Sequence, residues 1–162
     1  MIEGDELAGV VDQFGALTRD ELARAVEEVA FKRGEDLDRE RLDAAVDRAL
    51  ADLRLVAVER GGEELLAPGP TAFPALPEGA GDLPHILEVT PRTVERAALV
   101  EPAERRLREA AARAVAAGDD DRVADLLDAT YDLEAWAPGA DASGVRDRLD
   151  AALDAGEDPG DR

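Results

Sequence analysis

Cysteine is absent from this 162-residue chain, and histidine, serine and lysine occur once each. The absence of cysteine excludes disulfide bonds, zinc–cysteine sites, iron–sulfur clusters and thiol catalysis. One histidine cannot build a multi-histidine metal site, and the one serine, Ser143, does not lie in the Gly-x-Ser-x-Gly turn of a hydrolase. These shortages remove the commonest catalytic patterns and favour a function other than catalysis.

Long hydrophobic runs are also missing. No stretch approaches the roughly 20 apolar residues of a membrane-spanning helix. The sequence Met1–Asp5 has neither the basic nor the apolar region of a signal peptide. We therefore expect a soluble, cytoplasmic protein with no membrane partner. Aromatic residues make up only 3% of the chain, so the core should consist of Leu, Val and Ala with a few aromatic anchors, at Phe14, Phe31, Phe73, Tyr131 and Trp136.

The charge of the chain is strongly one-sided, because 39 acidic residues face 19 basic ones and give a net charge of -20. Lys32 is the only lysine, so the other basic residues are arginines. Such a chain repels itself at ordinary ionic strength, but in 1 M salt the Debye length falls to about 3 Å and most of the repulsion is screened. The composition resembles that of cytosolic proteins from halophilic archaea. On this interpretation the acidity is an adaptation to salt and says nothing about a partner.

Three helices are predicted in the first 52 residues. Leu7 opens an apolar face that ends near residue 15. Thr18 precedes Glu21 by three residues, which is the spacing of a capping box and predicts the start of a second helix. A third helix begins at the cap residue Asp38 and extends over 38–52.

The pattern then changes from helix to hairpin. Residues 55–58 (Leu-Val-Ala-Val) and 63–67 flank Gly61-Gly62, which is a favourable two-residue hairpin turn. Three helices followed by a hairpin within residues 1–68 resemble a winged helix-turn-helix domain. The resemblance rests on the order of the elements, and it implies a fold that is often used to bind DNA.

The remainder of the chain divides into a connector, a helical region and a tail. Residues 69–88 are rich in Pro and Gly, and because they include Phe73 and Leu76 we expect an irregular segment packed on a folded surface. Residues 89–153 should form a helical region. Its first helix is expected to start at Thr90-Pro91, and further helices should begin near residues 102, 121 and 143. Residues 154–162 are expected to be disordered. The predicted fold class is mainly α, with a winged-helix-like unit of three helices and a β-hairpin before a helical C-terminal region.

Two segments carry a resemblance to a known family. They are Ala-Leu-Pro-Glu-Gly at 75–79 and Tyr-Asp-Leu-Glu-Ala-Trp-Ala-Pro at 131–138. The whole chain is similar to a small acidic family of halophilic archaea that has no assigned activity. The resemblance implies a halophilic origin and transfers no functional residues.

Metal and cofactor sites are not expected. The series Asp36, Asp38 and Glu40 imitates the start of an EF-hand loop, but Arg41 stands where the loop needs glycine and Asp47 where it needs glutamate. The acidic series from Asp119 to Asp132 is better explained as a solvated helix face. Neither of the glycine-rich phosphate-binding motifs, Gly-x-Gly-x-x-Gly and the P-loop, occurs in the sequence. His85 could act as a general base only inside a pocket with a carboxylate, so an enzyme centred on His85 is our third hypothesis.

Nucleic-acid binding is the second hypothesis, and it depends on helix 38–52 and the hairpin tip. The candidate DNA contacts are Arg39, Arg41, Arg48 and Arg60. Five acidic residues accompany the three arginines of the helix, and phosphate binding needs a local basic patch. DNA binding therefore requires these arginines to share an uninterrupted exposed face.

Our first hypothesis is a non-catalytic adaptor that binds protein partners through helical surfaces. An adaptor should expose an apolar patch, and arginines on the helix near residues 102–117 are a further candidate surface, although an ion-paired helix face would explain them too. The candidate interaction residues are Phe73, Leu76, Arg105 and Arg108.

Overall fold

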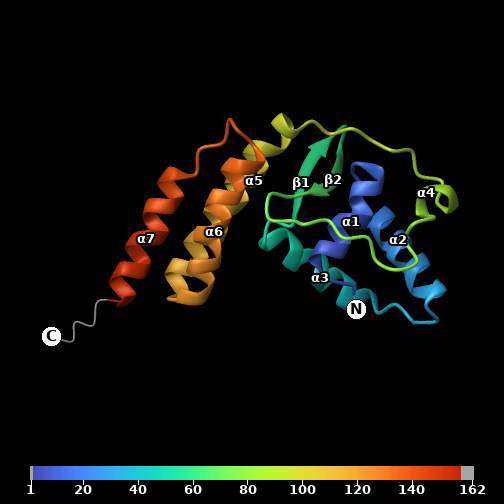
Figure 1. The fold of residues 1–162 in the computed structure, drawn as a ribbon, viewed down its shortest axis with the longest axis horizontal. Coiled ribbons are helices and arrows are strands. Elements are labelled where there is room, and N and C mark those ends of the chain that lie inside the picture. The colour runs from blue at the N-terminus through green and yellow to red at the C-terminus, as the bar shows by residue number, and fades with distance from the viewer. Residues whose placement is uncertain (1, 158–162) are drawn as a thin grey trace.

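The structure is a computed structural model, and it describes residues 2–157. Within this range the chain forms seven helices and one antiparallel hairpin (Figure 1). The predicted fold class is confirmed, since three helices and a hairpin precede a helical C-terminal region. In chain order the elements are α1 (Gly4–Phe14), α2 (Arg19–Lys32), α3 (Arg39–Ala51), β1 (Leu55–Arg60), β2 (Glu63–Pro68), α4 (Leu83–Ile86), α5 (Arg96–Ala117), α6 (Asp120–Trp136) and α7 (Ser143–Glu157).

Hydrogen bonds at the caps explain where α2 and α3 begin. Thr18 Oγ1 accepts from the Glu21 N–H at 3.1 Å, and Glu21 Oε1 accepts from the Thr18 N–H at 2.9 Å. Asp38 Oδ1 accepts from the N–H groups of Glu40 and Arg41 at 3.0 and 3.3 Å. Each cap satisfies N–H groups that have no partner within the helix, and such a cap is typically worth about 1 kcal/mol.

The hairpin turns at Gly61 and Gly62, whose φ angles are 61° and 83°. Positive φ at both central residues is the requirement of a type I′ turn and explains the two glycines. Leu17, between α1 and α2, exchanges two backbone hydrogen bonds with Leu66 of β2, at 3.0 and 2.7 Å. This bridge ties the start of α2 to the hairpin.

Both faces of the hairpin are covered by hydrophobic clusters. Leu55 and Leu66 belong to the cluster that α1, α2 and α3 form. Val56 and Ala67 belong to a second cluster, formed with α5, α6 and α7. Because consecutive side chains of a strand point to opposite faces, the hairpin is a layer shared by the two helical halves, as Figure 1 shows.

The connector, residues 69–88, lies against α1 and α2. The Gln13 side chain donates from Nε2 to the carbonyl of Ala80 at 3.0 Å, and Leu83 is fully buried. Gly9 allows close approach, because a Cβ at this position would lie 2.2 Å from the carbonyl oxygen of Ala75. Burial of Leu83, a side-chain hydrogen bond and a close backbone approach together hold the connector in place.

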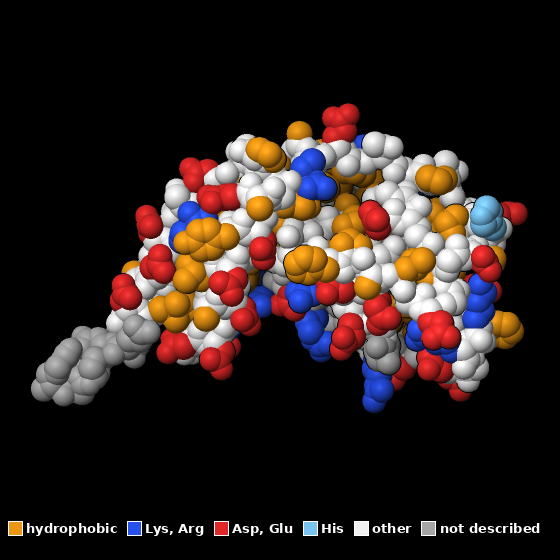
Figure 2. Space-filling model, in the orientation of Figure 1, with side chains coloured by type: hydrophobic (Ala, Val, Ile, Leu, Met, Phe, Trp, Pro, Cys, Tyr) orange, Lys and Arg blue, Asp and Glu red, His pale blue; other side chains and the backbone are white. Residues whose placement is uncertain are grey.

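The expected aromatic anchors were mostly wrong. Phe14 is fully buried and Trp136 is half-buried, but Phe31, Phe73 and Tyr131 are exposed by 78%, 81% and 56%. The reason is that Leu, Val and Ala already fill both clusters. Figure 2 shows hydrophobic side chains on one face as separate groups among charged ones.

The predicted helix start at Thr90-Pro91 was also wrong. Residues 88–95 are not helical, and α5 begins at Arg96 and continues through Pro102. Arg92 gives the physical reason, since its N–H donates to the carbonyl of Phe14 at 2.8 Å and holds the segment against the end of α1.

Residues 131–138, one of the two segments behind the family resemblance, form the corner where α6 meets α5 and α7. The Arg96 guanidinium lies 4.3 Å from the ring centre of Trp136, and its Nη1 donates to the Trp136 carbonyl at 2.8 Å. Arg146 of α7 donates from Nη2 to Glu134 Oε1 at 2.5 Å. This segment therefore has a structural role in joining the three C-terminal helices.

The C-terminal boundary differs from the prediction. Helix α7 extends to Glu157, beyond the expected limit at residue 153, and residues 158–162 of the predicted tail lie outside the described residues. Among residues 2–157, no helix combines the length and apolar character needed to cross a membrane.

Candidate interaction groove

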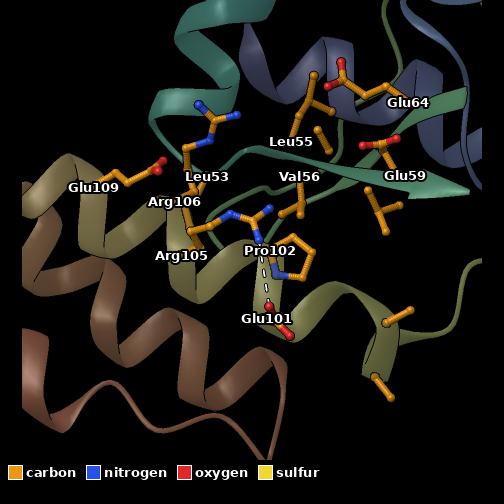
Figure 3. A pocket seen from close by; sticks show the side chains of 14 residues that line it. Leu53, Leu55, Val56, Glu59, Glu64, Glu101, Pro102, Arg105, Arg106 and Glu109 are labelled. Atoms are coloured by element: carbon orange, nitrogen blue, oxygen red, sulfur yellow. Dashed lines mark ion pairs between the residues drawn. The ribbon is translucent and has the colours of Figure 1, made fainter. Parts of the chain in front are cut away.

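A groove of about 590 Å³ lies between strand β1 and helix α5 (Figure 3). We call it the β1–α5 groove. The hairpin supplies its upper wall in Figure 3, and α5 supplies the opposite wall. Its lining consists of Leu53, Leu55, Val56, Ala57, Val58, Glu59, Glu64, Ala97, Ala98, Glu101, Pro102, Arg105, Arg106 and Glu109.

The hairpin wall contains consecutive residues of β1 from Leu55 to Glu59. A flat sheet face would present only every second side chain, because the side chains alternate. A run of consecutive residues instead shows that the groove follows the edge of β1. The hairpin has β2 on one side of β1, and in the described part of the chain no strand pairs with the other side. The groove therefore opens onto a free strand edge.

The side chains of α5 that line the middle of the groove are small and apolar. Ala97 and Ala98 are exposed, and Pro102 is half-buried. Proline has no N–H, so the carbonyl of Ala98, four residues earlier, lacks its usual helical donor. Because Ala98 lines the groove, this wall offers apolar contact area together with a carbonyl that lacks its helical partner.

Charged side chains surround the apolar part. Arg105 Nη1 lies 3.9 Å from Glu101 Oε1, the ion pair drawn in Figure 3. On the hairpin, Glu59 and Glu64 are directly opposite each other in the strand register. Two like charges in that position destabilise a hairpin. The lining holds two arginines and four glutamates, which give it a formal net charge of -2.

The predicted interaction residues do not form one surface. Arg105 lines the β1–α5 groove, whereas Arg108 lines a separate hollow between α5 and α7. Phe73 lines a hollow beside α6, and Leu76 is half exposed on the connector. Arg105 and Arg108 are one helical turn apart, yet they line different hollows, and the residue that lines the β1–α5 groove together with Arg105 is Arg106.

The predicted DNA-contact arginines of α3 lie close to acidic neighbours. Arg39 Nη1 is 2.9 Å from Glu27 Oε1 of α2, and Arg41 Nε is 3.8 Å from Asp38 Oδ2. Arg48 is exposed on the same helix. Two of the three arginines thus already have carboxylate partners within the protein.

The hairpin tip is acidic. Arg60 donates from Nη1 to the carbonyl of Thr93 at 3.4 Å. Around it stand Glu59, Glu63 and Glu64, so the tip carries one positive and three negative charges. A hairpin of this charge repels the phosphate backbone of DNA.

His85 is exposed on the four-residue helix α4. Figure 2 shows the pale blue histidine side chain projecting at the edge of the molecule. The enzyme hypothesis required this imidazole to share a pocket with a carboxylate, and an exposed position at the edge does not supply that environment.

The acidic face of α6 contributes Asp125, Asp128 and Asp132 to the hollow beside Phe73. Burial raises the pKa of Asp132, the carboxylate of Asp128 raises it further, and the charge of Arg54 opposes both effects. Within residues 2–157, no group of three or more His, Asp or Glu side chains is arranged to hold a metal ion.

Among the residues that line the groove, only Arg105 was a predicted interaction residue. A hairpin of two strands has an unpaired edge on each strand unless another element covers it, and Pro102 within a helical pattern indicates an irregularity. These two signals together could have located the groove. Which edge stays open depends on where Leu17 pairs, and that contact is tertiary.

No curated protein and no solved structure matches the chain. The model of a protein family, described as a family of unknown function (DUF7109), matches residues 5–154. The match includes the hairpin, the connector and nearly all of the helices, so both walls of the groove lie within it. The chain therefore belongs to the family of unknown function DUF7109.

Proposed function

We propose that the protein is a non-catalytic interaction module that binds a protein partner in the β1–α5 groove. The observation that carries the proposal is the free edge of β1 opening onto an apolar wall of α5. Backbone groups at a strand edge and small apolar residues together suit a polypeptide ligand. Arg105, a predicted interaction residue, lines this groove.

The charge distribution supports a protein partner over DNA. Arg39 and Arg41 have carboxylates nearby, and the hairpin tip carries more negative than positive charge. DNA affinity depends mainly on basic side chains that neutralise phosphates. A DNA-binding regulator that uses α3 is therefore the alternative, and the experiment below separates the two.

Filling the groove should abolish partner binding. Ala98→Trp places a large side chain in the groove at an exposed position, whereas Ala116→Trp places it at an exposed position of α5 outside the groove. Tagged wild type and both variants would be purified from a high-salt lysate of the source organism, half of each sample with nuclease. We expect a stoichiometric protein that survives nuclease with wild type and Ala116→Trp and is lost with Ala98→Trp.

Other outcomes would contradict the proposal. If Ala98→Trp retains the same protein, the groove is not the binding site. If DNA is recovered, or if the partners disappear after nuclease treatment, the winged-helix-like half binds nucleic acid.

We also propose that the protein works in a salt-rich cytoplasm, which the net charge of -20 supports. Screening of carboxylate repulsion should raise the melting temperature as KCl increases from about 0.1 M, where the Debye length is about 10 Å, to several molar. Far-UV circular dichroism at each salt concentration measures this. A melting temperature that does not change with salt would mean that the acidity has another role.

A further inference from the structure

The free edge of β1 has a defined hydrogen-bonding pattern. In a hairpin with a two-residue turn, the flanking pair Arg60 and Glu63 is hydrogen-bonded, and the pattern then repeats every second residue. The backbone groups of Val58 therefore point toward β2, and those of Ala57 and Glu59 point to the free edge. Leu66, which lies opposite Ala57, confirms this alternation. Its N–H and C=O point away from β1 and form hydrogen bonds with Leu17.

The outward-pointing groups are available to a ligand. Ala57 is half-buried and Glu59 is exposed. Neither backbone takes part in a hydrogen bond to a loop or helix in the described part of the chain. A polypeptide ligand could satisfy these groups by pairing as an additional strand, which is how sheet edges bind extended peptides.

The two faces of such a strand would meet different chemistry. Val56 belongs to the cluster shared with α5, and Val58 packs against it, so one face of an added strand would lie over Ala98 and Pro102. The other face would continue the side of the hairpin that carries Glu59. A matching peptide therefore has apolar residues at every second position on the α5 side.

The charge of the hairpin indicates which residues of the peptide would occupy the positions between the apolar ones. Glu59 and Glu64 face each other across the hairpin, and neither forms an ion pair with another described residue. A basic side chain beside Glu59 would add an opposite-charge pair across the strands, which would offset this repulsion. The net charge of -2 on the groove lining favours the same choice.

We propose that the β1–α5 groove binds an extended basic segment of a partner protein, which pairs with the free edge of β1 and alternates apolar residues with Lys or Arg. This inference rests on the proposed function of the groove. A second copy of the chain fits less well, because pairing two edges of this kind would bring two chains of net charge -20 together.

The test uses a displayed library of random eight-residue peptides, selected on the purified full-length protein in about 1 M KCl, where the Debye length is about 3 Å and the long-range attraction of basic peptides to the acidic chain is screened. We expect selected peptides to carry apolar residues at alternate positions and Lys or Arg between them. A synthetic peptide of the selected sequence should slow hydrogen exchange at the N–H groups of Ala57 and Glu59. The Ala98→Trp variant should not bind it, and Ala116→Trp should bind it as wild type does.

A charge reversal tests specificity. The double variant Glu59→Lys/Glu64→Lys keeps a like-charge pair in the hairpin, so its stability should remain close to that of wild type, but it should select acidic peptides in place of basic ones. Glu35→Lys/Glu88→Lys changes the net charge equally at exposed positions outside the groove and should leave the selection basic.

Each remaining outcome would overturn the inference. The inference fails if the selected peptides have apolar residues at helical spacing, or if wild type selects acidic peptides. It also fails if no selected peptide loses binding in Ala98→Trp. Finally, it fails if sedimentation shows a dimer and a second copy of the chain, without any peptide, protects the N–H groups of Ala57 and Glu59 from exchange. Failure of this inference can be distinguished from failure of the proposed function. If Ala98→Trp abolishes capture of a partner but no alternating basic peptide is selected, the groove binds a protein in another way. If capture is unaffected, the groove is not the site.

Discussion

Replacing Leu53 with alanine should lower the free energy of unfolding by about 2–5 kcal/mol, the range for deleting a fully buried leucine side chain. Leu53 is fully buried in the cluster of α5, α6 and α7, although it lies between α3 and β1. Its carbonyl also accepts a hydrogen bond from the Thr71 N–H at 3.1 Å. The buried side chain thus links the segment between α3 and β1 to the second half of the protein, and the backbone carbonyl links the same segment to the connector.

Glycine at this position should be no worse than alanine. Leu53 has φ of 62°, the left-handed conformation that glycine adopts without strain, and it is the only non-glycine residue of the described chain with positive φ. Relief of the backbone strain, about 1–2 kcal/mol, offsets the loss of the alanine methyl group. Leucine is present because its burial outweighs the backbone strain.

Leu50 provides the matched control. It is buried within α3 and 5% exposed. There, glycine should cost about 1 kcal/mol more than alanine because of its low helix propensity. Urea unfolding of the alanine and glycine variants at both positions measures the difference. If glycine is clearly worse than alanine at position 53 as well, the left-handed backbone is not the controlling factor.

Replacing Arg92 with methionine should destabilise the protein by about 1.5–3 kcal/mol, the range for a hydrogen bond to a charged group. Arg92 forms a two-pronged pair with Glu21, with Nη1–Oε1 at 2.7 Å and Nη2–Oε2 at 3.2 Å, and also donates to the carbonyl of Ala16 at 3.2 Å. The side chains are 27% and 17% exposed. Methionine keeps the apolar stem but leaves Glu21 with fewer donors.

The effect should depend on pH in a defined direction. Burial alone would raise the pKa of Glu21, but hydrogen bonds from Arg92 and Thr18 outweigh it, and the pKa lies below its ordinary value of 4.5. The folded state therefore binds fewer protons than the unfolded state near pH 4. The stability from this pair is present above about pH 4.5 and is lost as the pH falls through the lowered pKa.

Chemical denaturation at pH 7 and pH 3 would measure the difference between wild type and Arg92→Met, which should shrink at the lower pH. Arg39→Met is the control, because the pair of Arg39 with Glu27 is about half exposed on both sides. An exposed pair contributes about 0–1 kcal/mol. Equal losses for the two variants, or a loss for Arg92→Met that is independent of pH, would contradict the role assigned to Glu21.

Local signals in the sequence predicted the elements of the N-terminal half well. The spacing of Thr18 and Glu21 predicted the start of α2, and Gly61-Gly62 predicted the turn. The helix start predicted at Thr90-Pro91, from a proline at a possible first helical position, was wrong. The competing contact there is made by Arg92, which binds residues of α1 and α2 and holds the chain out of a helix.

The candidate site was predicted only in part. Arg105 lines the groove, but nothing in the sequence paired it with the edge of β1. The exposure of Phe73 was not predicted either. A phenylalanine in a Pro-rich segment suggests burial, but the side chain of Phe73 is 81% exposed. Whether a side chain is buried depends on the space left by other elements, and the aliphatic residues had already filled both clusters.

The sequence by itself determined the charge of the chain, the caps of α2 and α3 and the hairpin turn, because each depends on residues no more than a few positions apart. Only the tertiary structure decided that the hairpin lies between two hydrophobic clusters and that one edge of β1 stays open. It also decided that Glu21 meets Arg92, 71 positions away. Such contacts depend on how whole elements pack, and no local pattern encodes their partners.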